Sequence, residues 1–350
     1  MAGKRQHILP RFLLRGFASR VVGEKTFTWV YRISGEQFET TIENVGLEKH
    51  FYGKEGEVSA DDVITNLEGN YADLVRSLRN TSDGIEVQDT RIPELISHLT
   101  IRTKHLREFF LSSTEYLLGE VTTHLAEPRN LKRLLLSKPE LIQEELGKRL
   151  TDYQIPEEQR TFLVELVKAY APTLVDQHMS EFQETLMEMV GNIGDMLPRA
   201  VREGHIKSLA KNPAPENRSQ TYDKLRWFVR ESSIPLILGD FACLFEIARK
   251  RRFKSLDDMG DPIVNVYLPI SGQKVLVGTS YSSASHVDFS LINDATANCS
   301  YEYFVAPECS AANDKRASKL GAWAGLLTQA ELDALFHEII EDVERDPFGR

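Results

Sequence analysis

The alternation of apolar and polar residues near the N-terminus predicts a β-hairpin. Residues 26–32 alternate between β-forming and polar side chains, and so do residues 37–42. The intervening residues 34–36 are Ser, Gly and Glu, of which Ser and Gly are common in turns. The two alternating segments are therefore expected to pair as antiparallel strands.

The middle of the chain has the apolar spacing of α-helices. Between residues 61 and 80 the apolar side chains recur every three or four positions and form one stripe. A longer stripe predicts a single helix over residues 91–119, and further amphipathic segments predict several helices over 127–212. Residues 221–231 are expected to form one more short helix.

After residue 232 the pattern changes to short apolar runs, which predict strands. The predicted strands are residues 234–238, 241–247, 263–268, 274–279 and 301–305. A last helix is expected over about residues 329–344, with Thr328 as its N-cap. Segregated helices and strands indicate an α+β fold, in which the N-terminal hairpin and the C-terminal strands share one sheet. No internal repeat and no coiled coil is predicted.

A chain of 350 residues is long enough for one large domain or two intertwined ones. We expect one domain over residues 1–350. Its consecutive parts are the N-terminal motif and hairpin over 1–60, a helical region over 61–231, a β region over 232–310 and C-terminal helices over 311–350.

The composition predicts a globular, cytoplasmic protein. Hydrophobic residues make up 41% of the chain and charged residues 27%, and no apolar run approaches the length of a membrane span. Cys243, Cys299 and Cys309 show no disulfide or zinc spacing and are expected to be free core thiols. Such sparse cysteines fit a reducing compartment.

The basic residues are clustered, although the net charge of −10 argues against a general nucleic-acid coat protein. Residues 1–20, 199–230 and 249–254 are rich in Lys and Arg. These segments predict a basic face that binds the phosphates of a nucleic acid. The alternative is that they are solvated faces of ordinary helices.

The first twenty residues contain the most informative pattern. His7, Arg11 and Arg15 interrupt a run that is otherwise apolar. Because a buried charge must be paired, we expect these residues to be satisfied inside a site or held at its entrance. His7 is a candidate general acid or base, and Arg11 is a candidate phosphate-binding residue. The alternative for His7 is an ordinary hydrogen-bonded histidine.

Two predicted helices carry a charged residue on their apolar side. Arg102 stands where a leucine is expected, and His98 and His105 lie on the neighbouring turns. Glu68 occupies a similar position in the preceding helix. Opposite charges on inward faces predict an ion pair. The pair is either structural and fixes the helix register, or it faces a polar pocket in which Arg102 holds an anion.

Asp240 follows the predicted strand 234–238, and the ends of strands often present functional side chains. With Glu68 it is a candidate ligand for a divalent cation such as Mg²⁺ or Mn²⁺. The alternative is an aspartate that shapes a turn. The chain contains no Gly-rich phosphate loop, no Gly-x-Ser-x-Gly motif and no zinc-protease motif.

Short motifs follow one another along the whole chain. They are His7-Ile-Leu-Pro-Arg11-Phe, Trp29-Val-Tyr31, Asn44-Val-Gly46, Phe51-Tyr52, Leu67-Glu68, Arg102-Thr-Lys104, Leu238-Gly-Asp240-Phe and Leu268-Pro-Ile-Ser271. In this order they resemble the uncharacterised bacterial family catalogued as domain of unknown function 4238. The chain departs from that pattern around Asp240, where a Ser and an Asn-Pro are missing, and at Lys104, where the family has a proline. The resemblance implies a site at His7, Arg11, Glu68, Arg102 and Asp240, but no established activity.

Two functions remain open from the sequence. The first is a metal-dependent nuclease or another phosphodiester-cleaving enzyme, of the kind that serves defence against phage. In it His7 would move a proton, Arg11 and Arg102 would bind phosphate, and Glu68 and Asp240 would hold the metal. The alternative is a non-enzymatic sensor or binding module that holds an anionic ligand, a nucleotide or a partner protein. This alternative requires no nucleophile.

Overall fold

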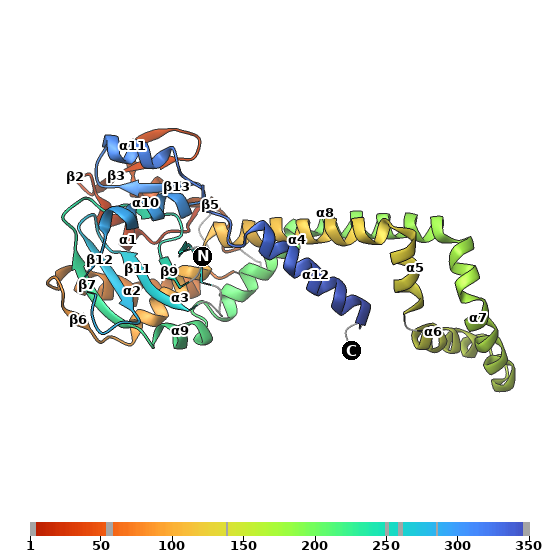
Figure 1. Ribbon diagram of the computed structural model, residues 1–350. Coiled ribbons are helices and arrows are strands. Elements are labelled where there is room, and N and C mark those ends of the chain that lie inside the picture. Colours follow the sequence, from red (N-terminus) through yellow and green to blue (C-terminus); the bar gives the residue numbers. More distant parts are fainter. Residues whose placement is uncertain are drawn as a thin grey trace. The chain divides into compact units, whose positions relative to one another are not determined.

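The computed structural model describes residues 5–53, 59–137, 139–248, 252–257, 262–284 and 286–345. The chain packs as two compact units (Figure 1). Unit 1 contains residues 1–109 and 201–326, and unit 2 contains residues 110–200 and 327–350. The expectation that the whole chain is one large domain stays a prediction.

The described strands all belong to unit 1 and form antiparallel sheets (Figure 1). The six-stranded sheet has the order β10 (Phe253–Lys254), β9 (Leu244–Ile247), β11 (Ile263–Pro269), β12 (Lys274–Thr279), β7 (Arg226–Glu231) and β6 (Glu86–Val87). The five-stranded sheet has the order β2 (Arg20–Val22), β3 (Lys25–Arg32), β13 (Tyr303–Ala306) and β8 (Leu238–Gly239), and β4 (Gln37–Thr41) also pairs with β3. A small sheet joins β1 (Arg5–His7) to β5 (Leu47–Lys49).

The fold is α+β, and the predicted hairpin is confirmed as β3 and β4. The expectation of one shared sheet is correct for β13 and β8, which pair with each other beside β3. It is wrong for the other C-terminal strands, which form the separate six-stranded sheet. The reason is local connectivity: β11 and β12 are joined by a short turn and pair with each other, so they build a sheet of their own.

Unit 1 also contains helices, which contribute less of the buried core than its strands and loops do. The helices are α1 (Arg11–Leu14), α2 (Asp61–Asn80), α3 (Arg91–Ile101), α9 (Glu216–Tyr222), α10 (Phe289–Cys299) and α11 (Ala311–Ala317), with short 3-10 turns at Arg15–Phe17 and Ile42–Asn44. The bounds of α2 match the prediction, and its apolar stripe is buried against α1 and α3.

Two predicted helices are wrong. The helix expected over 91–119 is two helices, α3 and α4 (Lys104–Ala126), with a break at Arg102 and Thr103. The helix expected over 221–231 is the end of α9 followed by strand β7. The apolar residues of β7 are consecutive rather than three or four apart, and their pairing with β12 decides for a strand. Cys309 is exposed rather than buried in the core.

Unit 2 contains only helices among the described residues. They are α5 (Pro128–Leu136), α6 (Pro139–Asp152), α7 (Glu157–Gln177), α12 (Gln329–Arg345), most of α4 and much of α8 (Met179–Lys211). Helix α7 packs against α5 and α6. Thr328 caps α12 as predicted, because its hydroxyl accepts the N–H of Glu331 while the Glu331 carboxylate accepts the N–H of Thr328. None of the described helices is long and apolar enough to cross a membrane.

Candidate functional site

Arg102 forms the link between α3 and α4. Its φ of −94° and ψ of 20° end α3, and the Thr103 hydroxyl then accepts the N–H of Leu106 and begins α4. The Arg102 side chain is only 1% exposed. The charged residue that interrupts the apolar stripe therefore marks a helix boundary, which the stripe alone does not reveal.

The Arg102 guanidinium is almost saturated by protein acceptors. Nε donates to the Tyr52 hydroxyl at 2.9 Å, and Nη2 donates to the backbone oxygen of His7 at 2.8 Å. Nη1 donates to Glu68 Oε1 at 2.5 Å and to His98 Nε2 at 2.9 Å. Four of the five N–H groups of this guanidinium are thus engaged. The geometry favours the structural ion pair over an anion-binding role for Arg102.

The partners of His98 define its tautomer. Arginine can only donate, so Nε2 of His98 is the unprotonated nitrogen that accepts from Arg102. Nδ1 then carries the hydrogen and donates to the backbone oxygen of Pro213 at 2.8 Å. Burial and the neighbouring guanidinium lower the pKa of His98 to about 3, which keeps the ring neutral. His98 is therefore a structural acceptor.

A second arginine and histidine repeat this arrangement on α4 and α8. Arg107 Nε donates to His205 Nδ1 at 3.1 Å, and His205 Nε2 donates to the backbone oxygen of Ile101 at 2.8 Å. Burial and Arg107 lower the pKa of His205 to about 4. Arg107 Nη2 also donates to the backbone oxygen of Phe51 at 2.8 Å. Sequence analysis missed this pair because its members lie far apart in the chain.

His7 is the predicted site residue that keeps a free functional atom. Its Nδ1 lies 3.2 Å from the backbone oxygen of Val45, which can only accept, so Nδ1 carries the hydrogen. Nε2 then has a lone pair, and no hydrogen bond joins it to another described residue. Burial and the nearby Arg11 lower the pKa of His7, so the ring is neutral near pH 7. Arg11 is exposed.

Asp240 is committed to the backbone of β13. Its Oδ1 accepts the N–H of Tyr301 at 3.0 Å, and its Oδ2 accepts the N–H groups of Glu302 at 2.6 Å and Tyr303 at 3.2 Å. Burial raises the pKa of Asp240 to about 6, although these N–H groups oppose the shift. The strand predicted at 234–238 is reduced to the short β8 beside it. Asp240 therefore lies in a turn, as the alternative to a metal ligand expects, and its carboxylate holds the backbone at the start of β13.

The candidate metal ligands have other partners in this arrangement. Glu68 is paired with Arg102, and both carboxylate oxygens of Asp240 accept backbone N–H groups. Within the part of the chain that the structure describes, no group of three or more His, Cys, Asp or Glu side chains is placed to hold a metal ion. The metal role of Glu68 and Asp240 stays a prediction without geometric support.

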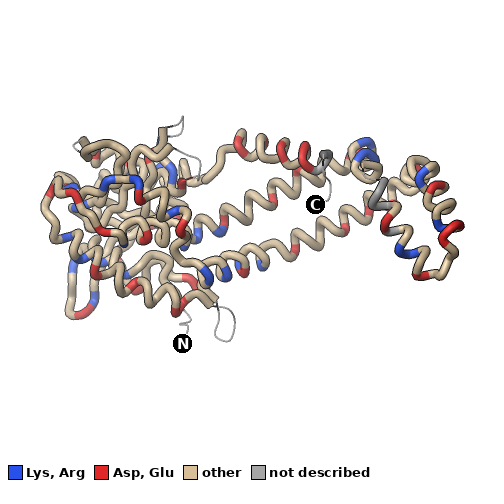
Figure 2. Tube along the Cα trace, turned by 90° about the horizontal axis from the view of Figure 1, so that it is seen from below, with Lys and Arg blue, Asp and Glu red and all other residues tan. Residues whose placement is uncertain are grey.

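Several arginines of the basic segments form ion pairs with carboxylates of unit 1. In the 199–230 segment, Arg218, Arg226 and Arg230 form ion pairs with carboxylates. In the 249–254 segment, residues 249–251 lie outside the described residues, and Arg252 pairs with Glu246. Residues 1–4 of the first segment are also outside the described residues. Lysines and arginines are interspersed with aspartates and glutamates along the described chain (Figure 2), and a nucleic-acid face stays a prediction.

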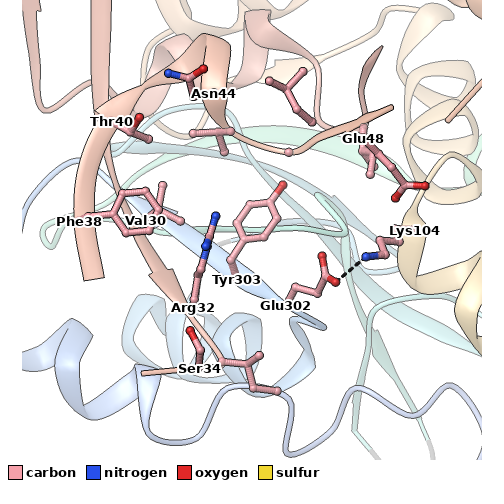
Figure 3. Close-up of a pocket in the computed structure, with 15 residues that line it drawn as sticks. Val30, Arg32, Ser34, Phe38, Thr40, Asn44, Glu48, Lys104, Glu302 and Tyr303 are labelled. Atoms are coloured by element: carbon pink, nitrogen blue, oxygen red, sulfur yellow. Dashed lines mark hydrogen bonds and ion pairs between the residues drawn. The ribbon is translucent and has the colours of Figure 1, made fainter. Parts of the chain in front are cut away.

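The hairpin pocket is a cavity of about 410 Å³ beside β3 and β4, a volume typical of small-molecule sites. Figure 3 shows its charged and polar lining. The full lining is Ile8, Val30, Arg32, Ile33, Ser34, Phe38, Thr40, Asn44, Val45, Gly46, Leu47, Glu48, Lys104, Glu302 and Tyr303. The sequence analysis did not single out this lining, although Lys104 stands at one of the two departures from the family pattern.

Two cations, Lys104 and Arg32, lie at the hairpin pocket, and each forms an ion pair that is partly exposed to solvent. Lys104 Nζ contacts Glu302 Oε1 at 2.6 Å (Figure 3), with both side chains partly exposed. Burial lowers the pKa of Lys104, but the hydrogen bond with Glu302 and the charges of the neighbouring carboxylates together outweigh burial and raise it. The Arg32 guanidinium stacks over the Phe38 ring, 4.9 Å from the ring centre, and pairs with exposed Glu36. Exposed pairs of this kind are weak.

The Tyr303 hydroxyl lies beside Gly46, in the loop that joins the 3-10 turn at Ile42–Asn44 to strand β5. Burial raises the pKa of Tyr303 well above its usual range, so the hydroxyl stays protonated. No hydrogen bond joins this hydroxyl to another described residue. Gly46 passes so close that a Cβ at that position would lie 2.5 Å from the hydroxyl oxygen, and its φ of +59° favours glycine. Glycine thus lets the loop form one wall of the pocket.

Strand β1 connects Arg102 and its hydrogen-bond partners with the hairpin pocket. Arg102 and Tyr52 both donate to the backbone oxygen of His7 in β1. The His7 ring and the N–H of Ile8 in turn bond to the backbone oxygens of Val45 and Gly46, which line the pocket. The His7 to Arg11 motif therefore fixes the loop that closes the pocket.

The chain matches a known protein family over most of its length. The family model described as protein of unknown function (DUF4238) matches residues 5–306, which include every described strand and all residues that line the hairpin pocket. No curated protein and no solved structure matches this chain. Because the match spans most of the chain, the protein belongs to the DUF4238 family.

Proposed function

We propose that this protein is a binding module whose hairpin pocket holds a small molecule that carries an anionic group. The observation that supports the proposal is the meeting of Arg32, Lys104 and the Tyr303 hydroxyl at one cavity of about 410 Å³. Tyr303 is partly exposed and lines the pocket, and its hydroxyl has no acceptor among the described residues, so it is available to donate to a ligand. A carboxylate or phosphate oxygen would satisfy it.

The neighbouring cations suit an anion because neither is strongly held. The Arg32–Glu36 and Lys104–Glu302 pairs are partly exposed, so a ligand anion competes with a weak protein pair. A guanidinium also matches a carboxylate or phosphate in a bidentate geometry. Glu302 and Glu48 add negative charge to the lining, which favours ligands that also carry a hydrogen-bond donor or a cation.

The test is a ligand screen with a matched arginine control. Phosphate, nucleoside monophosphates and carboxylic acids are added to the full chain, and thermal stability and calorimetric binding are measured. We expect binding that Arg32→Met weakens at least tenfold, a loss of about 1.4 kcal/mol or more. Arg76→Met, at an exposed pair outside the pocket lining, serves as the control and should bind like the parent chain. Binding that Arg32→Met leaves unchanged would contradict the proposal.

Phosphodiester hydrolysis is the second candidate, and His7 is the observation that favours it. Its neutral ring with a free Nε2 lone pair is the correct form for a general base, and Arg11 lies close enough to influence its pKa. A metal-dependent mechanism would require Glu68 and Asp240 to leave their present partners. The candidate enzyme therefore depends on His7 and Arg11 more than on Arg102 and Asp240.

A cleavage assay separates the two candidates. DNA, RNA and transfer RNA are incubated with the full chain and Mg²⁺ or Mn²⁺, beside His7→Gln and Arg32→Met. The hydrolytic candidate requires cleavage that His7→Gln abolishes and Arg32→Met preserves. Cleavage that persists in His7→Gln would remove His7 from the mechanism. Ligand binding without any cleavage would leave the binding module as the function.

A further inference from the structure

Unit 2 exposes an unusual amount of apolar surface. Among the described residues, twelve of the eighteen exposed large hydrophobic side chains belong to unit 2. The three buried apolar clusters found in the described residues all belong to unit 1. Helices gain most of their stability by burying an apolar face, and extended exposed patches mark interaction surfaces. The helices of unit 2 therefore leave apolar side chains exposed for contact with a partner.

Helix α8 carries the most regular row of exposed apolar residues in unit 2. Between residues 179 and 200 apolar residues recur with alternating steps of three and four, a heptad spacing that covers only three heptads and so does not by itself predict a coiled coil from the sequence. The heptad seam consists of Met179, Phe182, Leu186, Met189, Ile193, Met196 and Ala200. None of these residues is buried, and the residues that α8 does bury, Ile206 and Leu209, lie beyond the seam in unit 1.

We propose that the heptad seam of α8 pairs with the same seam of a second copy of this chain. A row of apolar positions at heptad spacing is complementary to itself, as a two-fold symmetric interface requires. The acidic residues of the segment are Glu181, Glu184, Glu188 and Asp195. In the heptad they occupy positions c and f, which face away from the seam, so two copies meet without like charges in contact. This inference does not depend on the function of the hairpin pocket.

The exposed area agrees with a dimer contact. Phe182, Met189, Ile193 and Met196 each expose roughly half of their surface. With about 200 Å² for a free large side chain, these four residues alone offer on the order of 400 Å² per protomer. A stable interface buries about 800 Å² per partner, so they supply about half of the usual area. Met179, Leu186 and the residues that flank the seam add to it.

The chain offers a closely matched pair of methionines for the test. Met187 and Met189 lie on the same helix and are 54% and 56% exposed, but only Met189 belongs to the seam. We expect the full chain to sediment as a dimer, and Met189→Glu to weaken the dimer about a hundredfold, because a carboxylate would have to be buried at the contact. Met187→Glu places the same charge outside the seam and should leave the dimer intact. Circular dichroism verifies that both variants keep their helices.

Each possible result decides the proposal. A dimer that Met189→Glu dissociates and Met187→Glu preserves supports it. A full chain that stays monomeric at the highest soluble concentration overturns it. This result needs only the parent chain, so it holds even if a glutamate variant fails to fold. A dimer that survives the combined change Met189→Glu and Ile193→Glu, or one that Met187→Glu dissociates equally, overturns it too.

Discussion

Arg102 donates a hydrogen bond from Nη1 to Nε2 of His98 at 2.9 Å, so a permanent cation and a neutral histidine lie together in the core. The pairing is stable because Nδ1 of His98 donates a hydrogen bond to the backbone oxygen of Pro213. The second N–H of Arg102 Nη1 donates to the Glu68 carboxylate. The relationship fixes the tautomer of His98 and leaves Arg102 little capacity for a ligand. It also connects the helix boundary to β1, whose His7 oxygen accepts from the same guanidinium.

Loss of the Arg102 guanidinium should destabilise unit 1 strongly. Arg102→Met leaves the partly buried Glu68 without its cation and removes a hydrogen bond from Tyr52, His98 and the backbone of His7, so we expect a loss of about 3–5 kcal/mol of unfolding free energy. Trp29, Trp227 and Trp323 all lie in unit 1, so tryptophan fluorescence during urea unfolding reports on this unit. Arg76→Met, which removes an exposed arginine, should change the same free energy by less than about 0.5 kcal/mol.

Acidification should destabilise unit 1 through its two buried histidines. The pKa values of His98 and His205 fall from 6.5 to about 3 and about 4 in the folded chain, so the unfolded chain binds protons first as the pH decreases below 6.5. Each histidine then lowers the unfolding free energy by up to about 1.4 kcal/mol per pH unit.

Asp240 acts in the opposite direction between pH 6 and 4. Its pKa rises from 3.8 to about 6 on folding, so its stabilising protonation is complete below 3.8 and lost as the pH rises through 6. One aspartate offsets about one histidine, and a net slope of about 1.4 kcal/mol per pH unit remains. Urea unfolding at a series of pH values measures this slope. His98→Gln should flatten it, whereas His178→Gln, at an exposed histidine, should not; equal slopes in both variants would show that His98 does not titrate as described.

Two glycines with the same backbone angle separate strain from steric contact. Gly23 and Gly46 both have a φ of +59°, but only at Gly46 would a Cβ meet a neighbour, the Tyr303 hydroxyl at 2.5 Å. Gly23→Ala should therefore cost about 1–2 kcal/mol of unfolding free energy from the backbone alone. Gly46→Ala should cost more and should also weaken ligand binding, because it displaces the pocket wall. If the two changes had equal effects on stability and on binding, the Tyr303 side chain would be able to move away from the new Cβ without loss of either property.

Lys104 tests the chemistry of the hairpin pocket without a large change in stability. It is the first residue of α4, where proline is well tolerated because its missing N–H is not required. Lys104→Pro removes one cation from the pocket and should weaken the binding of an anionic ligand about tenfold, equal to about 1.4 kcal/mol. Calorimetry measures the affinity, and circular dichroism should show unchanged helix content. Unchanged affinity would exclude Lys104 from the binding site.

Most of the local structure could be predicted from the sequence, but the site only in part. His7, Glu68 and Arg102 stand out in the sequence because they are charged or polar within apolar patterns, and the structure does place them in one cluster. Asp240 stands out by its position after a predicted strand, and its carboxylate binds the backbone at the start of β13. The sequence pattern identifies polar residues that need a hydrogen-bond or charged partner, but it does not reveal whether a ligand or the protein itself supplies that partner.

The sequence alone determined the elements whose evidence is local. The spacing of apolar residues was sufficient for α2, and alternation was sufficient for the β3–β4 hairpin, because helix and hairpin contacts join residues close in the chain. The Thr328 cap is local in the same way. Tertiary structure decided the rest: pairing with β12 made β7 a strand, and contacts with β1 gave Arg102 its partners. The exposure of Met189 on α8 is likewise a tertiary property, because a sequence does not state which apolar stripe the fold leaves uncovered.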